Sequence, residues 1–268
     1  MVDEQTLTLI SAVARAAEEL GVPWLLTGAM ARALLLENVY GLTPGRATMD
    51  VDVVVTVETW GKFGLLTDRI CQDPRFSRDP KQAQRLRCSA GGYLDRIPFG
   101  GIEAEGHLIR WPPDGSIEMN VSGFREACTH AQIVIVNDSI PVPVISPEGL
   151  TLVKFIAWRD RHREKPRKDA SDLAYLLRHY ATVFSTARLF DEHPDALEAA
   201  DYDPELAAAR VLGRELARIS NSDTAALVSE LLSTELKAGE ESDLVREVAE
   251  GLSPRDRELA FRLLTALL

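Results

Sequence analysis

The stretch Asp50-Val-Asp-Val-Val-Val-Thr56 decides the fold of this chain. Its valines are typical of a β-strand, and Val51 and Val53 are expected to face the core. The two aspartates face the other way, because alternate residues of a strand share a side, and their Cα atoms then lie about 6.5–7 Å apart. Two such carboxylates can close on one hard cation, so the stretch predicts a metal site on a strand.

Helical and strand patterns alternate around this strand. Leucines and alanines spaced by three and four residues, closed by Gly21 and Pro23, predict an amphipathic helix before it. Short β-like pieces separated by turn residues follow it as far as Val144. The predicted helices cover 4–20, 29–37 and 58–71, and the predicted strands cover 24–26, 50–56, 84–88, 93–99, 107–111, 116–121, 132–136 and 140–144. We expect one mixed sheet flanked by helices.

Ser146-Pro147-Glu148 is a helix-start signal, and nearly everything after it has helical composition. The chain is therefore predicted to be an α/β (α+β) protein with a helical C-terminal domain. We expect a catalytic domain over 1–146 and a helical domain over 147–268 that completes the cleft.

The net charge is −11, because 268 residues contain 30 Lys and Arg against 41 Asp and Glu. This balance argues against a general nucleic-acid or anionic-membrane coat. The segment 154–168 departs from it, with seven basic residues against Asp160 and Glu164. A solvated helix face and a phosphate- or RNA-facing edge both explain such a segment. Trp158 inside it is expected to pack against a helix.

The three cysteines, Cys71, Cys88 and Cys128, are far apart and form no CxxC pair. Neither a disulfide framework nor a zinc ribbon is expected, and a reducing compartment suits them. The most apolar stretch, 22–40, is interrupted by Arg32 and Glu37, and the acidic start disfavours a secretory signal. We therefore expect a cytoplasmic protein with no membrane partner.

Two features near the aspartate pair extend the candidate site. Upstream, Thr27-Gly28-Ala29 joins a strand to a helix, whose first amides and positive dipole end can hold a phosphate. Downstream, Asp95 lies in a β-like segment and offers a third acid. Three carboxylates on adjacent strands can hold two Mg²⁺ ions about 3.5–4 Å apart, and the third can accept the proton of an attacking hydroxyl. Together they predict a phosphoryl- or nucleotidyl-transfer site.

Two of the charged residues near this site also have a simpler interpretation. Asp95 can instead form a surface ion pair with Arg87 or Arg96. Arg46 is either a phosphate contact or an exposed loop charge. The competing third acids are Glu103, Glu105 and Glu118.

The same Asp-x-Asp spacing recurs in Asp201-Tyr-Asp203-Pro. There it stands in a helix-rich region before a proline, so a turn or a helix N-cap explains it. The spacing alone therefore does not define a site, and its structural context must decide.

The order of these motifs resembles the polymerase-β-type nucleotidyltransferase superfamily. The likeness is nearest to its toxin-like branch, the abortive-infection and type IV toxin–antitoxin nucleotidyltransferases, and covers roughly residues 20–180. The motifs that carry it are Leu26-Thr27-Gly28-Ala29, Arg46-x-Thr48-x-Asp50-x-Asp52, Leu94-Asp95, Lys154 and Arg167-Lys168-Asp169-x-x-Asp172.

The resemblance implies a nucleotidyltransferase fold and a role for each motif. Asp50 and Asp52 would ligate Mg²⁺, and Asp95 would be the third ligand or the base. Lys154 would contact the triphosphate, and Asp169 or Asp172 would organise the base or sugar side. The nucleotide-binding set would be Thr27, Gly28, Ala29, Arg46, Thr48, Lys154, Lys168, Asp169 and Asp172. Ala29 departs from the family pattern, which has Ser or Gly there, so no serine hydroxyl is available to hold the γ-phosphate.

We therefore expect transfer of a nucleoside monophosphate from a nucleoside triphosphate such as ATP to an acceptor hydroxyl, with two Mg²⁺ ions. The acceptor is open between a tRNA end, a protein, including a cognate antitoxin, and a small aminoglycoside-type cation. A non-catalytic nucleotide-binding module of the same fold is the alternative that Ala29 suggests.

Overall fold

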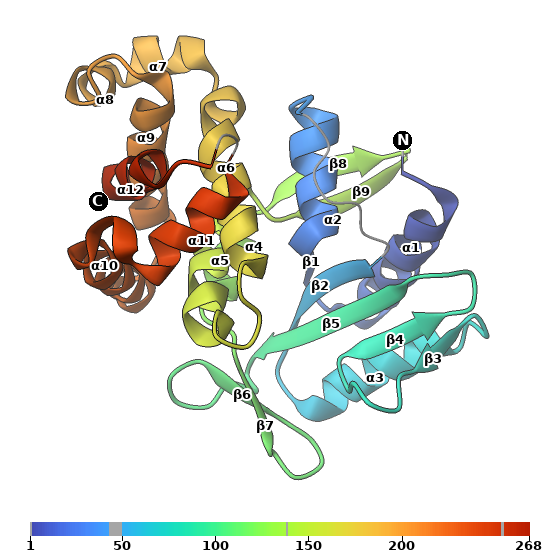
Figure 1. Cartoon of the computed structure of the whole chain (residues 1–268). Coiled ribbons are helices and arrows are strands. Elements are labelled where there is room, and N and C mark those ends of the chain that lie inside the picture. The colour runs from blue at the N-terminus through green and yellow to red at the C-terminus, as the bar shows by residue number, and fades with distance from the viewer. Residues whose placement is uncertain (1, 43–49, 138, 253–254) are drawn as a thin grey trace. The chain divides into compact units, whose positions relative to one another are not determined.

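The computed structural model describes residues 2–42, 50–137, 139–252 and 255–268 (Figure 1). It divides into two compact units, Met1–Ser146 and Pro147–Leu268. Among the described helices, none is both long and apolar enough to cross a membrane.

The first unit alternates helices and strands. In chain order it contains α1 (Glu4–Leu20), β1 (Trp24–Thr27), α2 (Gly28–Arg32), the π-helix η1 (Ala33–Val39), β2 (Asp50–Val57), α3 (Trp60–Cys71), β3 (Phe76–Arg78), β4 (Arg85–Cys88), β5 (Tyr93–Gly100), β6 (Leu108–Trp111), β7 (Ile117–Asn120), α4 (Phe124–Thr129), β8 (Gln132–Val136) and β9 (Ile140–Val144).

Seven of these strands form one mixed sheet in the order β3-β4-β5-β2-β1-β9-β8. β2 is parallel to β5 and antiparallel to β1, whereas β4 is antiparallel to β5. The predicted fold class, a mixed sheet flanked by helices, is thereby confirmed.

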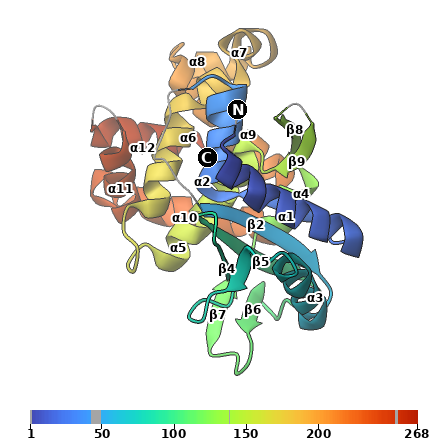
Figure 2. The ribbon, with the colours of Figure 1, turned by 90° about the vertical axis from the view of Figure 1, so that its right-hand side faces the viewer.

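The two faces of the central strands differ. On one face, fully buried Val53 lies beside Arg96 in the register of β2 and β5. Arg96 donates a hydrogen bond to Thr67 and stacks over the ring of Phe63, both on α3. α3 therefore covers this face, and α1 packs beside α3 (Figure 1, Figure 2). Asp50 and Asp52 project from the opposite face.

β6 and β7 form a separate two-stranded hairpin instead of joining the sheet, so the prediction of a single sheet was wrong for them. The hairpin projects away from the main sheet in both views (Figure 1, Figure 2). A turn rich in proline and glycine lets the two strands pair with each other locally. Buried Trp111 anchors the hairpin, because its ring contacts Trp60 and Phe63 with centroids 5.4 and 5.8 Å away.

The second unit is helical throughout, with its own apolar core. α6 packs against α5, α9 and α11 (Figure 1). The elements are α5 (Pro147–Arg161), α6 (Lys168–Phe184), α7 (Thr186–Glu192), α8 (Pro194–Ala199), α9 (Pro204–Ile219), α10 (Ser222–Lys237), the 3-10 helix η2 (Gly239–Glu241), α11 (Asp243–Gly251) and α12 (Arg257–Ala266).

The second Asp-x-Asp pair lies in this unit. Asp203 is the N-cap of α9, and its carboxylate accepts hydrogen bonds from the backbone nitrogens of Glu205 and Leu206. Pro204 occupies the first turn of the helix. The N-cap interpretation of this pair is confirmed, so its spacing is explained without a ligand.

Candidate functional site

A row of polar side chains crosses four neighbouring strands on the face opposite α3. The register places Thr27 beside Asp52, Asp52 beside Asp95, and Asp95 beside Arg85. Residues opposite one another in a sheet project to the same side, so these four form one line. Together with Asp50, we name them the carboxylate row.

Asp50 begins β2 and projects to the same face as Asp52. It lies opposite Tyr93, and its side chain is 38% exposed. Its Oδ2 is 3.6 Å from a terminal nitrogen of Arg85. The intervening Val51 is fully buried, as the valine pattern predicted.

Arg85 grips Asp95 with a two-pronged ion pair. Its Nε donates to Oδ1 at 2.8 Å, and a terminal nitrogen donates to Oδ2 at 2.6 Å. The guanidinium also lies 4.4 Å from the ring centroid of Tyr93. The hydrogen bonds to Asp95, and then the negative charges of Asp95, Asp50 and Asp52, raise the already high pKa of Arg85. The row thus contains a permanent cation.

The ion-pair partner of Asp95 is Arg85 and neither of the arginines suggested from the sequence, Arg87 and Arg96. Arg87 pairs instead with Asp79 at 2.7 Å. Arg96 points into the opposite face, where burial lowers its pKa to about 10. Strand alternation explains the difference, because Arg85 and Asp95 are register partners whereas Arg96 follows Asp95 and must face the other way.

The competing third acids lie elsewhere in the first unit. Glu103 is 2.7 Å from Nδ1 of His107, beyond the end of β5. Glu118 pairs with Arg110 within the β6–β7 hairpin. Glu105 is exposed in the loop before that hairpin. Of the candidates, Asp95 is the one in register with Asp52.

Gly28 makes room for Asp52. Its φ is +70°, a conformation that favours glycine, and a Cβ built there would lie 2.2 Å from Oδ2 and 2.9 Å from Cβ of Asp52. Gly28 begins α2, and the preceding Thr27 makes no side-chain capping hydrogen bond to that helix. The turn therefore shapes the position of Asp52, and Ala29 continues the helix without a hydroxyl.

The described residues only partly fit the predicted metal site. In the described ranges, no group of three or more His, Cys, Asp or Glu side chains is placed to hold a metal ion. Both oxygens of Asp95 are engaged by Arg85. Asp50 and Asp52 supply carboxylate oxygens from one strand face, which is the donor chemistry that Mg²⁺ prefers. The roles of Asp50, Asp52 and Asp95 as metal ligands stay predictions, and Arg46 and Thr48 lie outside the described residues.

The remaining predicted residues lie in the helical unit and form a second charged cluster. Nζ of Lys154 lies 3.0 Å from Oδ1 of Asp169 and 2.6 Å from Oδ2 of Asp172. Arg161 donates to both oxygens of Asp169, at 2.7 and 2.8 Å. We name these four residues the buried ion cluster. Lys168, the first residue of α6, is exposed beside it.

Burial affects the charges of this cluster strongly, because the side chain of Asp169 is only 1% exposed. Burial alone would raise the pKa of Asp169, but the hydrogen bonds from Arg161 and the charge of Lys154 outweigh it and lower the pKa to about 2. Burial would likewise lower the pKa of Lys154, yet the charges of Asp172 and Asp169 raise it above its usual value. Lys154 and Asp169 are therefore both charged near neutral pH.

The basic segment 154–168 is not a uniform cationic face. Lys154 and Arg161 belong to the buried ion cluster, Arg159 pairs with Asp160 at 2.7 Å, and Arg167 pairs with Glu250 at 2.7 Å. These four positions are largely neutralised within the helical unit. Trp158 in the same segment is 2% exposed, which confirms that it packs inside the protein.

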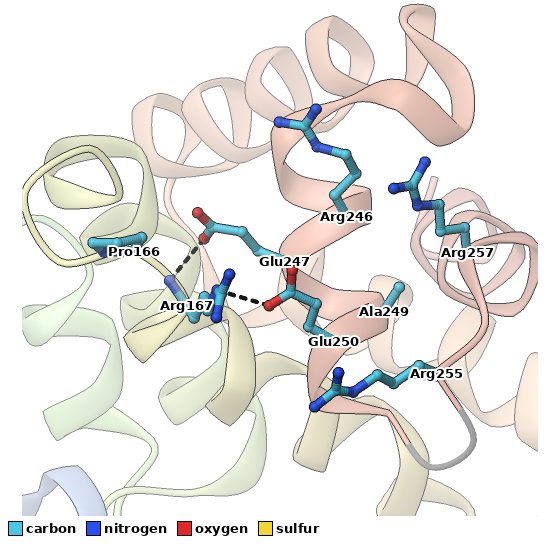
Figure 3. A pocket seen from close by; sticks show the side chains of 8 residues that line it. All are labelled: Pro166, Arg167, Arg246, Glu247, Ala249, Glu250, Arg255 and Arg257. Carbon is cyan, nitrogen blue, oxygen red and sulfur yellow. Dashed lines mark hydrogen bonds and ion pairs between the residues drawn. The ribbon is translucent and has the colours of Figure 1, made fainter.

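A hollow of about 520 Å³ lies in the helical unit (Figure 3). Two carboxylates face its four guanidinium groups, and two further carboxylates, Asp243 and Glu241, pair with Arg246 and Arg257. With the pair between Arg167 and Glu250, three of the four arginines thus have a carboxylate partner. Its lining is Pro166, Arg167, Arg246, Glu247, Ala249, Glu250, Arg255 and Arg257.

Arg85 and Arg161 are the two charged residues that the sequence analysis did not include in the site. The turn Ser89-Ala-Gly-Gly92 between two strand patterns was a signal for Arg85, because a hairpin centred there pairs residue 85 with residue 95. The seven-residue spacing from Lys154 was a signal for Arg161, since it puts both on one helix face.

Residues 11–250 match the family model described as nucleotidyl transferase AbiEii toxin, type IV TA system. The match covers most of both units, and the chain is therefore a nucleotidyltransferase. It belongs to the AbiEii family of type IV toxin–antitoxin nucleotidyltransferases. The resemblance stated from the sequence is confirmed, and the non-catalytic alternative is set aside.

Two solved structures are similar to this chain. One is a crystal structure of ANT(2″)-Ia in complex with adenylyl-2″-tobramycin, with 17% identity, a TM-score of 0.42, and coverage of 69% of this chain and 92% of that one. The other is a solution structure of the antibiotic-resistance factor ANT(2″)-Ia, with 16% identity, a TM-score of 0.40, and coverage of 75% and 99%. No curated protein matches the sequence.

Proposed function

We propose that the chain transfers a nucleoside monophosphate from a nucleoside triphosphate such as ATP to an acceptor hydroxyl, and that Asp50 and Asp52 hold Mg²⁺ for this reaction. The observation that carries the proposal is the strand-borne aspartate pair on the sheet face opposite α3, in a chain of a nucleotidyltransferase family. The acceptor oxygen attacks the α-phosphorus, the bond to the oxygen bridging to the β-phosphate breaks, and pyrophosphate leaves. Bound Mg²⁺ would stabilise the attacking and leaving oxygens, with two ions as the expected number.

The first unit would supply the groups closest to the reacting phosphate. Asp95 would serve as the third ligand or as the base that takes the acceptor proton, once Arg85 releases it. The positive φ of Gly28 brings the backbone close to Asp52, and Thr27 or backbone amides would replace the missing serine hydroxyl at Ala29. Arg46 and Thr48 would contact the nucleotide from the segment before β2.

The second unit, residues 147–268, would supply further nucleotide-binding groups to the catalytic domain proposed for residues 1–146. Lys154 would meet the triphosphate after exchanging one of its two carboxylate partners for a phosphate. Asp169 and Asp172 would organise the base or sugar side, and Lys168 would add a further phosphate contact.

We propose the end of a tRNA as the acceptor. The toxin description of the family and the exposed cations Arg163, Lys165 and Lys168 support it. A protein hydroxyl and a small aminoglycoside-type cation are the other outcomes of the test. A cognate antitoxin is the expected partner, and a reducing cytoplasm suits the three free cysteines.

The experiment incubates the protein with α-labelled or γ-labelled nucleoside triphosphates, Mg²⁺ and either tRNA, total protein or an aminoglycoside. We expect the α-label and not the γ-label to appear in the acceptor. Replacing Asp50 and Asp52 by Asn should reduce transfer by about 10²–10³-fold, because the charge developing on the phosphate loses its stabilisation.

The second Asp-x-Asp pair provides a matched control. Asp201→Asn with Asp203→Asn makes the same change at the same spacing, and Asn is as good an N-cap as Asp. This variant should transfer label like the wild type. Equal transfer by the wild type and by the Asp50→Asn/Asp52→Asn variant would refute the proposal.

A further inference from the structure

The guanidinium of Arg85 lies among the carboxylates that are proposed to hold metal. It engages both oxygens of Asp95 and is 3.6 Å from Asp50. Its side chain is 19% exposed and stacks over Tyr93, so the surroundings hold it in place. A cation therefore already sits where a metal ion bridging Asp50 and Asp95 would also sit.

Formal charges sharpen this observation. The formal charges of Asp50, Asp52, Asp95 and Arg85 sum to −2, and Asp50 and Asp52 take part in further interactions within the protein. A divalent ion that bridged to Asp95 would meet oxygens already committed to hydrogen bonds and a like charge within a few ångströms. Because the two cations repel each other, each would weaken the other's interaction with Asp95.

We infer that Arg85 is a built-in counter-cation that competes with a divalent metal ion for Asp95. The inference rests on the proposed function, because it takes Asp50 and Asp52 as the primary metal ligands. In the absence of nucleotide the chain then binds a divalent ion weakly, through Asp50 and Asp52. Asp95 joins the metal site when Arg85 moves to another anion, and the planar guanidinium is well suited to a phosphate.

A purely structural role for the ion pair predicts the opposite behaviour. If Arg85 only fastened β4 to β5, its removal would loosen the strands and leave metal binding unchanged or weaker. If it competes, its removal frees Asp95 and strengthens metal binding. Arg87 provides the matched control, because it lies two residues away on the same strand and face but pairs with Asp79.

The experiment titrates the full chain with Mn²⁺ alone and follows free Mn²⁺ by electron paramagnetic resonance. We expect Arg85→Met to bind Mn²⁺ about tenfold more tightly than the wild type or better, because a positive charge is removed beside the ion. Arg87→Met should stay within about twofold of the wild type, since its exposed charge is screened. Mn²⁺ should also raise the Tm of Arg85→Met more than that of the wild type.

Two more variants make each outcome decisive. Arg85→Lys keeps the charge but loses the fork, so it should bind Mn²⁺ more tightly than the wild type and less tightly than Arg85→Met. Unchanged or weaker binding in both Arg85 variants, with a circular dichroism spectrum like that of the wild type, would overturn the inference. If Asp50→Asn/Asp52→Asn leaves Mn²⁺ binding unchanged in the wild-type and Arg85→Met backgrounds, the metal site of the proposed function fails instead.

Discussion

The carboxylate row and the buried ion cluster are built alike but balanced differently. In each, an arginine fork grips one aspartate: Arg85 holds Asp95, and Arg161 holds Asp169. The buried ion cluster contains two cations and two anions, whereas the row contains one cation and three anions. Asp169 is 1% exposed, but Asp95 is 13% exposed and Asp50 is 38% exposed.

The difference separates a cluster whose formal charges cancel from a row whose formal charges do not. Within the buried ion cluster Asp169 and Lys154 are the buried pair, at 1% and 10% exposed, whereas Arg161 is 34% exposed. Removing Asp169 takes one of two carboxylate partners from the buried Lys154. In the row, the formal charges of the four ionised side chains sum to −2, and Asp50 is 38% exposed, so a cation can reach it from water. The predictions that follow test this contrast, beginning with the largest effect.

We expect the largest difference in stability between the two clusters when the aspartate that the arginine holds, Asp169 or Asp95, is replaced by alanine. Asp169→Ala should lower the free energy of unfolding by about 3–5 kcal/mol, because Lys154 stays buried and loses a partner. Asp95→Ala should cost about 1 kcal/mol or less, since Arg85 keeps Asp50 nearby and is partly solvated. Urea unfolding of both variants measures the difference, and equal losses would contradict the contrast.

Gly28 tests whether the row depends on the geometry of its backbone. Gly28→Ala should reduce nucleotidyl transfer by about 10²-fold, because the new Cβ displaces the carboxylate of Asp52 by roughly an ångström. Gly21 is the matched control, since its φ is +59° and a Cβ there meets nothing within 4 Å. Gly21→Ala should cost about 1 kcal/mol of stability and leave transfer intact. Loss of transfer in both variants would point to general strain instead.

Acid should weaken the buried ion cluster. The pKa of Asp169 is about 2 when folded, against 3.8 ordinarily, so its charged form stabilises the fold above pH 3.8. This contribution, about 2 kcal/mol, is lost as the pH falls from about 4 towards 2. Unfolding free energies measured between pH 5 and pH 2.5 should therefore fall less steeply for Asp169→Asn than for the wild type. Parallel curves would show that Asp169 does not contribute.

Most of the fold could be predicted from local patterns. The valine run of β2 and the leucine and alanine spacing of α1 depend on residues near one another, so periodicity reveals them. β3 and α4, with three and six residues, are too short to show a period. The turn between β6 and β7 favours their local pairing, but the contact of Trp111 with α3, which holds the hairpin where it lies, is long-range and no local pattern encodes it.

Strand alternation predicted part of the candidate site. It placed Asp50 and Asp52 on one face. Alternation alone left Glu103, Glu105 and Glu118 open beside Asp95, and only the register of β2 with β5 puts Asp95 next to Asp52. The partners of Asp95 and Asp169 were missed, because an arginine in the sequence does not reveal which of several acids it will reach. Only strand register selects Arg85 over Arg87, and only the fold of α5 against α6 brings Arg161 to Asp169.

In β2, alternate residues face opposite sides of the sheet, so the register of this strand decides which side chains reach the candidate site. Positions 50 and 52 face the row, and positions 51 and 53 face the core. An insertion or deletion of one residue inside β2 would exchange the two sets, burying carboxylates and exposing valines at once. A loop between strands can change length while the ladder keeps its partners. Loops between strands can therefore change length without moving the row, whereas a one-residue shift within β2 removes both aspartates from it.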